Sequence, residues 1–424
     1  MERAAQKVIK KLKSSDDNDK FAALTFIPKI WASPQELMDS GYSKQVWDSL
    51  SSTHFLERAI ISRGSMDIIF MILSIFSKFV SEQDIMLYIP HLTKNINNNE
   101  ALVAIIDIFS YSNDVSPLFE CIELTLEVLP KVNQILSKSK DCSMTPKVFC
   151  ARKTLISQIT GQASIPSREH VFRFLSHMIT LTRGKFALFS DANSIDINPF
   201  MAFLRLAMIE MRLQLDTPIN YIDIEKEIKK ERDNMNNKDV VEDIEAHEEE
   251  EKESFVNIDF SHSIGPLINE GLFAASGSLL EHLVYVLIEN EEYLDDNHVS
   301  DYFSTINSII SDVILLFQEV IPEREFKRND FHYLLVIFAK WLNEGPFLCQ
   351  NNEIIKALPT IINILLHFHD ESSLLLPAFH TIITSVGSSA FNQTNITSLL
   401  DQFDSGESND LENIICEIRS CLKK

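Results

Sequence analysis

The side chains in this sequence best suited to metal binding are its histidines, and their spacing argues against it. His367 and His369 lie two residues apart in "HFHD", and His380 follows later. Residues two apart on a helix point in different directions, so this pair cannot chelate one metal ion. His282 and His298 have no recognised ligand spacing either. We therefore predict surface or partly packed histidines, and no metal site.

The cysteines do not form a recognisable motif. They stand at 121, 142, 150, 349, 416 and 421, without a C-x-x-C pair. Neither the spacing of Cys142 and Cys150 nor that of Cys416 and Cys421 is typical of a zinc site. This usage is typical of a reducing compartment, and it predicts single buried thiols instead of a disulfide framework.

One apolar stretch carries unusual charges. "NPFMAFLRLAMIEMRLQLD" (198–216) places Arg205, Glu210 and Arg212 in an otherwise apolar helix. Glu210 and Arg212 lie two apart and cannot pair with each other within the helix. The first interpretation is that they find partners on another helix and fix its register. The second is a charged groove for a ligand peptide. The first is the one we favour.

Motifs for catalysis are missing from the sequence. Neither G-x-G-x-x-G, nor G-x-x-x-x-G-K-[ST], nor G-x-S-x-G occurs. Carboxylates are plentiful in a chain with 61 acidic residues, so their presence alone does not indicate a catalytic pair. The sequence therefore predicts no enzyme, no catalytic residue and no cofactor, and it leaves the protein-binding residues unknown.

Composition indicates helices as the elements that position these side chains. Only 10 of the 424 residues are glycine, which disfavours sheets and nucleotide-binding loops. The net charge of −23 repels phosphate backbones and anionic lipids, so we expect no nucleic-acid partner. The longest strongly apolar run, "IIFMILSIFS" (68–77), is too short to cross a bilayer, so we expect no transmembrane segment.

The first 31 residues predict two helices and a corner. "MERAAQKVIKKLKS" is basic and amphipathic, which fits a targeting presequence or an ordinary first helix; the acidic cluster from Asp16 to Asp19 favours the helix. That helix is expected to end near Lys13. Ser14, Ser15, and Asp16 or Asp17 are the candidate N-caps of the second helix. Pro28 should kink or divide the second helix, because it lacks an N–H group.

The same helical pattern continues to the end of the chain. Apolar stripes at helical spacing predict helices near 43–62, 66–80, 82–95, 99–112, 117–138, 148–160, 168–183, 199–215, 264–290, 294–320, 328–343, 351–369, 372–386 and 407–423. Many are apolar on more than one side, as expected of helices packed between two neighbours. We predict an all-α fold, an armadillo- or HEAT-like α-solenoid superhelix of stacked helical hairpins.

An acidic segment interrupts this pattern. Residues 223–253 hold 14 acidic and 6 basic side chains and few large apolar ones. Such a segment cannot bury enough apolar surface to fold alone. We predict an N-terminal repeat block (1–222), a disordered linker or loop (223–257) and a C-terminal repeat block (258–424). An acidic interaction tract for a basic partner is the alternative for the middle segment.

Several collinear stretches resemble the neurochondrin family. "KVIKKLKSSDDNDKFAALTFIPKI" looks like the N-terminal helical pair of that family, and "YSKQVWDSLSSTHFLERAI" and "SEQDIMLYIPHL" are similar to the segments that follow it. "FMAFLRLAMIEMRLQL", "LLVIFAKWLNEGPFLCQNNEIIKALPTIINIL" and "LLLPAFHTI" resemble later family helices. Pro28 and the strongly charged segment depart from the family pattern, and the chain stops before the C-terminal helices of animal members.

The resemblance implies a non-catalytic scaffold or adaptor that binds other proteins in signalling or membrane-trafficking complexes. Kinases, small GTPases and membrane-receptor tails are the partners that it implies. A cytoplasmic location is expected, with a nuclear pool or peripheral membrane association as variants. The alternative function is a regulator that changes the activity of a kinase or small GTPase by direct contact.

Overall fold

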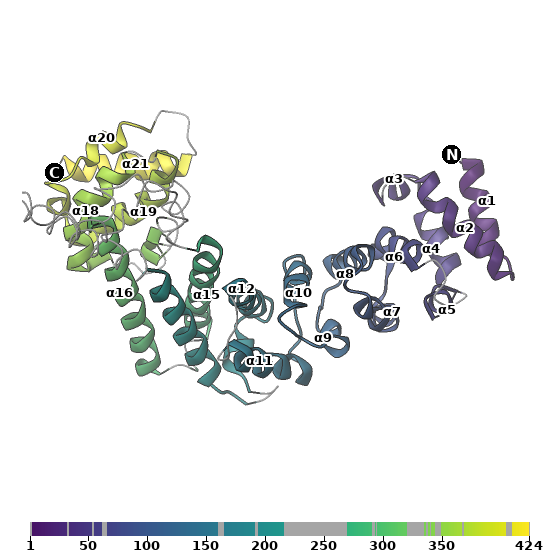
Figure 1. Ribbon diagram of the computed structural model, residues 1–424. Helices are drawn as coiled ribbons and strands as arrows, with labels where there is room; N and C mark the ends of the chain where they lie inside the picture. The colour runs from purple at the N-terminus through teal and green to yellow at the C-terminus, as the bar shows by residue number, and fades with distance from the viewer. Residues whose placement is uncertain are drawn as a thin grey trace, which may run out of the picture. The chain divides into compact units, whose positions relative to one another are not determined.

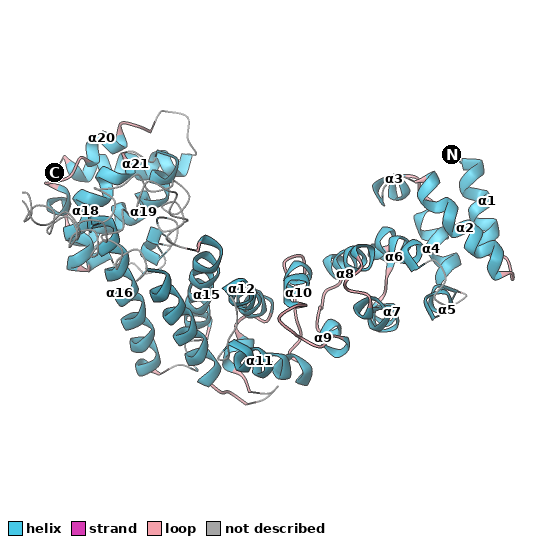
Figure 2. Cartoon of the chain, viewed as in Figure 1, coloured by secondary structure: helices cyan, strands magenta, loops and turns pink. Residues whose placement is uncertain are grey.

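The described part of the chain is mostly helical. A computed structural model describes residues 2–423 except 32–33, 53–54, 62–65, 160–164, 191–193, 216–268, 291–292, 294, 320–334, 336–337, 340, 344–348, 367–368 and 404–408. No strand occurs among these residues, and their only β-type pairing is an isolated bridge between Phe189 and Ile195 (Figure 2). The prediction of an all-α fold is therefore confirmed for them.

The first half of the chain contains many short helices (Figure 1). They are α1 (Glu2–Leu12), α2 (Asp17–Ile30), α3 (Pro34–Asp39), α4 (Ser43–Ser51), α5 (Phe55–Ile61), α6 (Met66–Ile75), η1 (Ser77–Phe79), α7 (Glu82–Lys94), α8 (Asn99–Tyr111), α9 (Pro117–Cys121), α10 (Leu129–Leu136), α11 (Pro146–Ile159), α12 (Ile165–Leu181) and α13 (Lys185–Leu188). A further helix covers 198–215.

The second half contains longer helices. They are α15 (Glu270–Glu289), α16 (Asp296–Glu319), α18 (Asn352–Leu365), α19 (His369–Val386), η5 (Ser388–Phe391), α20 (Ile396–Leu400) and α21 (Asn409–Leu422). The chain divides into two compact units, Met1–Phe200 with Tyr285–Tyr293 and Met201–Val284 with Leu294–Lys424. The predicted linker 223–257 lies outside the described residues, so the predicted three-part division stays a prediction.

In the first unit, helices contact each other in two rows. In one row α6 contacts α8, α8 contacts α10, and α10 contacts α12 (Figure 1). In the other row α5 contacts α7, α7 contacts α9, and α9 contacts α11. The rows are joined where α5 meets α6, α7 meets α8, and α11 meets α12. Each of these helices therefore packs against the next helix but one, and α5, α7 and α11 also pack against a partner in the other row.

Helix α8 illustrates why the sequence supports this packing. Its N-cap Asn98 accepts a hydrogen bond from the Ala101 N–H, which satisfies one of the free donors of the first turn. Its buried residues recur at helical spacing and include Ala101, Ala104, Ile105, Ile108 and Phe109. The two small alanines allow close approach of a neighbouring helix, and the larger residues fill the remaining space.

The second unit is also built from helices in contact with their neighbours. Helix α16 contacts α18, α18 contacts α19 and α20, and α19 contacts α21. Helix α18 buries a broad apolar surface that includes Ile354, Leu358, Ile361 and Leu365. This width is expected of a helix that packs against more than one other helix.

Several sequence-based boundaries need correction. The predicted helix 43–62 is two helices, because α4 ends at Ser51 and α5 begins at Phe55. The predicted helix 117–138 is two helices, because 122–128 are not helical and Pro130 stands at the start of α10. A proline is well tolerated in a first turn, where its missing N–H would have had no partner. Pro28 does not divide α2, which runs on to Ile30. The proline lies in the last turn, so few hydrogen bonds are affected.

The predicted N-terminal corner is confirmed. Helix α1 ends at Leu12, and Asp16 is the N-cap of α2, with its Oδ1 accepting a 2.9 Å hydrogen bond from the Asn18 N–H. Asp17 and Asp19 lie in the first turn of α2, where the helix dipole favours negative charge. Of the candidate caps, Asp16 is therefore the one that acts.

Candidate functional site

Of the charged residues of helix 198–215, Arg212 contacts another helix of the second unit, and Glu210 contacts a side chain of its own helix. Arg212 donates a hydrogen bond to Ser308, and its Nε lies 3.6 Å from the Asp312 carboxylate; both partners are on α16. Glu210 is buried and accepts a 3.0 Å hydrogen bond from the Gln214 amide. The Arg212 contacts support the interpretation that these charges fix helix register; the Glu210 contact lies within the helix, and Arg205 is exposed.

Two further hydrogen bonds, through Gln214 and Asn269, connect helix 198–215 to α15. The Gln214 side-chain oxygen accepts a 3.0 Å hydrogen bond from the Asn269 N–H. Asn269 in turn accepts a 2.9 Å hydrogen bond from the Leu272 N–H at the start of α15. Helix 198–215 is thus tied to α15 through Gln214 and to α16 through Arg212.

The histidines are dispersed. His380 Nε2 lies 3.0 Å from Glu417 Oε2 and joins α19 to α21. His298 Nδ1 lies 2.6 Å from Asp295, and His282 Nδ1 lies 2.6 Å from the Ser278 carbonyl oxygen. Across the described residues, no group of three or more His, Cys, Asp or Glu side chains could hold a metal ion. His367 lies outside the described residues.

The cysteines differ in their environments. All six are free thiols; Cys142 and Cys349 are buried, and Cys121 and Cys421 are half-buried. Burial raises the pKa of Cys349 to about 11, and it also raises the pKa of Cys142. The prediction of buried thiols is therefore right for these two and wrong for Cys150 and Cys416, which are exposed. Cys150 directly follows the buried pair Val148 and Phe149 on α11 and is nevertheless exposed.

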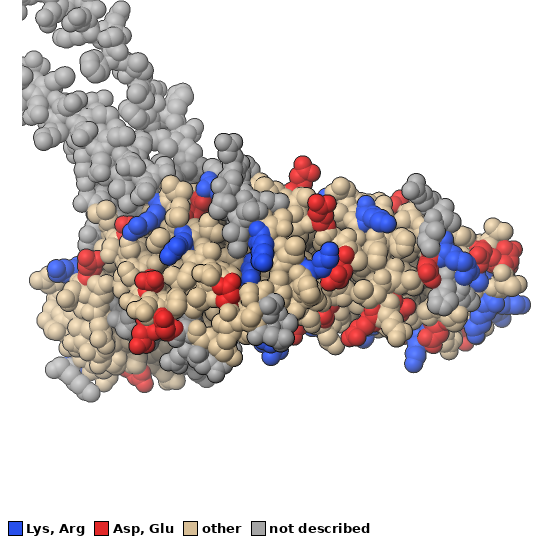
Figure 3. All heavy atoms as spheres, turned by 90° about the horizontal axis from the view of Figure 1, so that it is seen from below, with Lys and Arg blue, Asp and Glu red and all other residues tan. Residues whose placement is uncertain are grey.

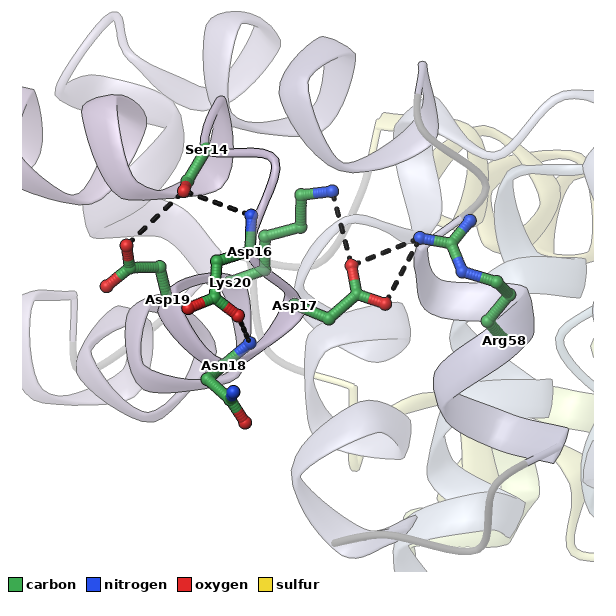
Figure 4. A network of polar contacts seen from close by, with 7 residues as sticks. All are labelled: Ser14, Asp16, Asp17, Asn18, Asp19, Lys20 and Arg58. Atoms are coloured by element: carbon green, nitrogen blue, oxygen red, sulfur yellow. Dashed lines mark hydrogen bonds and ion pairs between the residues drawn. The ribbon is translucent and has the colours of Figure 1, made fainter.

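The N-terminal corner carries a network of charges (Figure 4). Asp17 lies 3.2 Å from the Arg58 guanidinium on α5 and 3.4 Å from the Lys20 ammonium. Asp19 lies 3.0 Å from the Lys11 ammonium on α1. Partial burial raises the pKa of Asp17, but the hydrogen bonds from Arg58 and Lys20 outweigh it and lower that pKa overall. The network joins α1, α2 and α5.

Several loops of the first unit are connected by hydrogen bonds that main-chain N–H groups donate. The Val115 N–H, after α8, donates to the Asp141 carbonyl over 3.0 Å, and the Cys142 N–H donates to the Leu181 carbonyl over 3.1 Å. Asp114 accepts hydrogen bonds from the main-chain N–H groups of Ser116 and Ser143, over 2.9 and 2.8 Å. We call residues 112–116, 141–143 and 181–182 the loop seam. It links the loops that follow α8, α10 and α12.

Arg152 on α11 is a buried cation that the sequence interpretation missed. Its Nη1 donates 2.6 Å hydrogen bonds to the carbonyl oxygens of Phe186 and Phe189, and its guanidinium lies over the rings of Phe149 and Phe186. Burial lowers the pKa of Arg152, and the nearby Asp196 opposes this shift. A signal was present in the sequence: Arg152 lies at helical spacing from the buried Val148 and Leu155.

Most of the hydrogen bonds and ion pairs described above connect helices or loops of the same unit. Among the helices that the structure describes, none is both long and apolar enough to span a bilayer. Compared with models of known protein families, the chain matches none, and no curated protein matches it significantly. The functional interpretation therefore depends on the helix packing and on the surface chemistry.

Proposed function

We propose that this chain is a non-catalytic helical-repeat scaffold that binds other proteins. One observation carries the proposal: in the first unit α6, α8, α10 and α12 contact in succession, and so do α5, α7, α9 and α11. Two parallel rows of this kind are how α-solenoids bury a continuous core. The seam between the loops after α8, α10 and α12 supports the same arrangement.

A repeat scaffold binds partners through side chains that successive helices present on one surface. Large apolar side chains are exposed on adjacent helices here, such as Met86 on α7 and Val103 and Tyr111 on α8, each about half exposed. Apolar atoms in this position contribute binding energy when a partner covers them. The proposed partners are proteins, in agreement with the resemblance to neurochondrins and with a cytoplasmic adaptor in signalling or trafficking complexes.

Hydrogen exchange tests the repeat stacking on which the proposal depends. Val132 on α10 is fully buried, so Val132→Ala should leave a small cavity there. In a repeat array each helix depends on its neighbours, so amide exchange should rise most in α8, α10 and α12. Leu12→Ala on α1 is the matched control, and it should raise exchange in α2 and α4. A uniform rise along the first unit for either variant would contradict the stacking.

Proximity labelling tests the binding role separately. The full chain and the variant Val103→Ser/Tyr111→Ser should be compared in cells, with Leu374→Ser on α19 as an exposed apolar control. We expect a reproducible set of labelled proteins, part of which is lost only in the α8 variant. If the full chain labels no protein above a helical control of similar size, the scaffold function is wrong even where the stacking holds.

A further inference from the structure

Helix α1 presents a row of cations to solvent. Its apolar residues Ala5, Val8 and Leu12 are buried, and the helix contacts α2 and α4. The exposed cations recur at intervals of four and three, which places them together on the opposite side of the helix. Figure 3 shows Lys and Arg side chains gathered over the N-terminal helices at the right of the view. We call the following residues the basic face: Arg3, Lys7, Lys10 and, just beyond the helix end, Lys13.

The basic face differs from the cations next to it. Lys11 is paired with Asp19, and Lys20 and Arg58 are paired with Asp17. Among the ion pairs that the described residues form, by contrast, none includes a basic-face side chain. The basic face is therefore uncompensated positive charge in a chain whose net charge is −23.

The stability of α1 does not account for these charges. Arg3 lies in the first turn of the helix, where the helix dipole disfavours a cation. Arg3 and Lys7 are also like charges four residues apart, an arrangement that destabilises a helix, and Lys7 and Lys10 are three apart. Only Lys10 lies in the last turn, where the dipole favours a cation. An anion lying along the basic face would relieve this repulsion.

The dimensions of the basic face fit a short anionic polypeptide. At 1.5 Å per residue, Arg3 and Lys10 lie about 10 Å apart along the helix axis. An extended polypeptide advances about 3.3 Å per residue, so about four of its residues cover that distance. Successive cations of the face are separated along the axis by less than the screening length of about 8 Å at physiological salt. One bound segment therefore interacts with all of them.

The surroundings of the basic face favour a short acidic segment over an extended anionic surface. A helix that binds at a membrane interface inserts its apolar face, whereas the apolar face of α1 is buried and the helix contacts α2 and α4. The exposed carboxylates of Glu2 and Asp16 also flank the basic face in the chain, one before Arg3 and one after Lys13. A bilayer or a nucleic acid extends beyond the face and would meet them, whereas a segment of a few residues meets only the cations.

We propose that the basic face binds an acidic segment of a partner protein, rich in Asp and Glu and extended along α1. Carboxylates of the segment pair with Arg and Lys through charge-assisted hydrogen bonds. Because these pairs form at the surface, the contact is weak by itself and sensitive to salt. The inference adds a second binding surface to the apolar side chains of α7 and α8, and its test does not depend on the outcome for those helices.

Zero-length coupling of a synthetic peptide to the full chain tests the contact. The peptide consists of about six glutamates, enough to span the face, and its carboxylates are coupled to lysine amines at low salt. We expect Lys7 and Lys10 to couple to it several-fold more often than the exposed Lys78 and Lys138 do. Acylation of the same lysines by a neutral reagent corrects for differences in their reactivity. Raising the salt to about 1 M, where the screening length falls to about 3 Å, should remove the preference.

Neutralising the basic face provides the matched variant. Binding of a fluorescent form of the same peptide, followed by anisotropy, should weaken several-fold in Arg3→Gln/Lys7→Gln/Lys10→Gln/Lys13→Gln. The control removes the same charge from exposed lysines elsewhere in the first unit and should weaken binding far less: Lys78→Gln/Lys94→Gln/Lys138→Gln/Lys153→Gln. Both variants should stay folded by circular dichroism, because all the substituted side chains are exposed and the first variant relieves repulsion along α1.

Two results would overturn the proposal. One is equal coupling of the peptide to all four lysines after correction, or equal weakening of its binding in the two variants, because overall charge would then explain the binding. The other is binding of the chain to phosphatidylserine vesicles that the basic-face variant abolishes, without preferential coupling of the peptide. In that case the basic face would belong to a membrane surface.

Discussion

Two arginines of the first unit show how differently the same side chain can stabilise a helical array. Arg152 is 2% exposed and donates to two carbonyl oxygens at 2.6 Å, whereas the Arg58 side chain is 50% exposed and contacts Asp17 at 3.2 and 3.4 Å. Both link a helix to a neighbouring segment through hydrogen bonds. Buried polar groups depend on their partners, whereas exposed ones exchange them for water at little cost.

The partners of Arg152 explain how a buried cation is tolerated without an ion pair. Phe186 lies within α13 and Phe189 directly follows that helix, and the last carbonyls of a helix have no intrahelical donor. These carbonyls carry partial negative charge, which the guanidinium complements. The rings of Phe149 and Phe186 cover its faces. Arg152 thus serves as the donor that the end of α13 lacks.

The largest effect is expected for Arg152→Ala. It removes a donor from the Phe186 and Phe189 carbonyls and leaves a cavity, so the free energy of unfolding should fall by about 3–4 kcal/mol. Urea denaturation followed by circular dichroism measures it. Arg152→Lys keeps the charge but not the planar guanidinium, so its free energy of unfolding should lie between those of the wild type and Arg152→Ala. A loss below about 1 kcal/mol in the alanine variant would show that burial does not set the energy here.

The loop seam should come next in magnitude. Asp114→Ala removes the acceptor of the Ser116 and Ser143 N–H groups and should cost about 2 kcal/mol, since the carboxylate is partly exposed. Although burial raises the pKa of Asp114, hydrogen bonds from Ser143 and Ser116 lower it overall. The ionised Asp114 therefore stabilises the fold at pH values above its ordinary, unfolded-state pKa. This stabilisation is lost as the pH falls through the lower pKa that Asp114 has in the folded chain. The gap between wild type and variant should narrow accordingly in denaturation curves below pH about 4.

Asp107 on α8 provides the opposite pH dependence. Ser74 on α6 donates a hydrogen bond to its carboxylate, but burial raises the pKa of Asp107. A raised folded pKa means that ionisation destabilises the fold as pH rises through it. Asp107→Asn keeps an acceptor for Ser74 without the charge, so it should stabilise the chain at pH 7 by about 1 kcal/mol. The gain should vanish in acid; a gain that persists unchanged there would refute the charge explanation.

The sequence was sufficient to predict local features, but it was not sufficient to predict contacts between residues that are far apart in the chain. The apolar stripes of α7 and α8 and the Asp16 cap involve residues within a few positions of one another, so a local pattern contains them. The seam and the Arg152 contact join residues that are far apart in the chain, such as Asp114 with Ser143 and Arg152 with Phe189. The break between α9 and α10 is different, because Pro130, which stands in the first turn of α10, is visible in the sequence. Periodicity predicts which face of a helix is buried, but it does not predict which buried polar group meets which partner.

The smallest effect is expected for Arg58→Ala, and it tests the exposed side of the comparison most directly. Asp17 keeps its contact with Lys20 when Arg58 is removed, and solvent can replace the lost hydrogen bonds. The midpoint of urea denaturation should therefore shift less than in any variant above, and the shift should disappear as salt screens the pair. Arg3→Ala, which removes an exposed arginine without an ion pair, is the matched control. If Arg58→Ala destabilised the chain as much as Arg152→Ala, at all salt concentrations, the corner network would be a structural anchor despite its exposure, and degree of burial would not be the property that separates the two arginines.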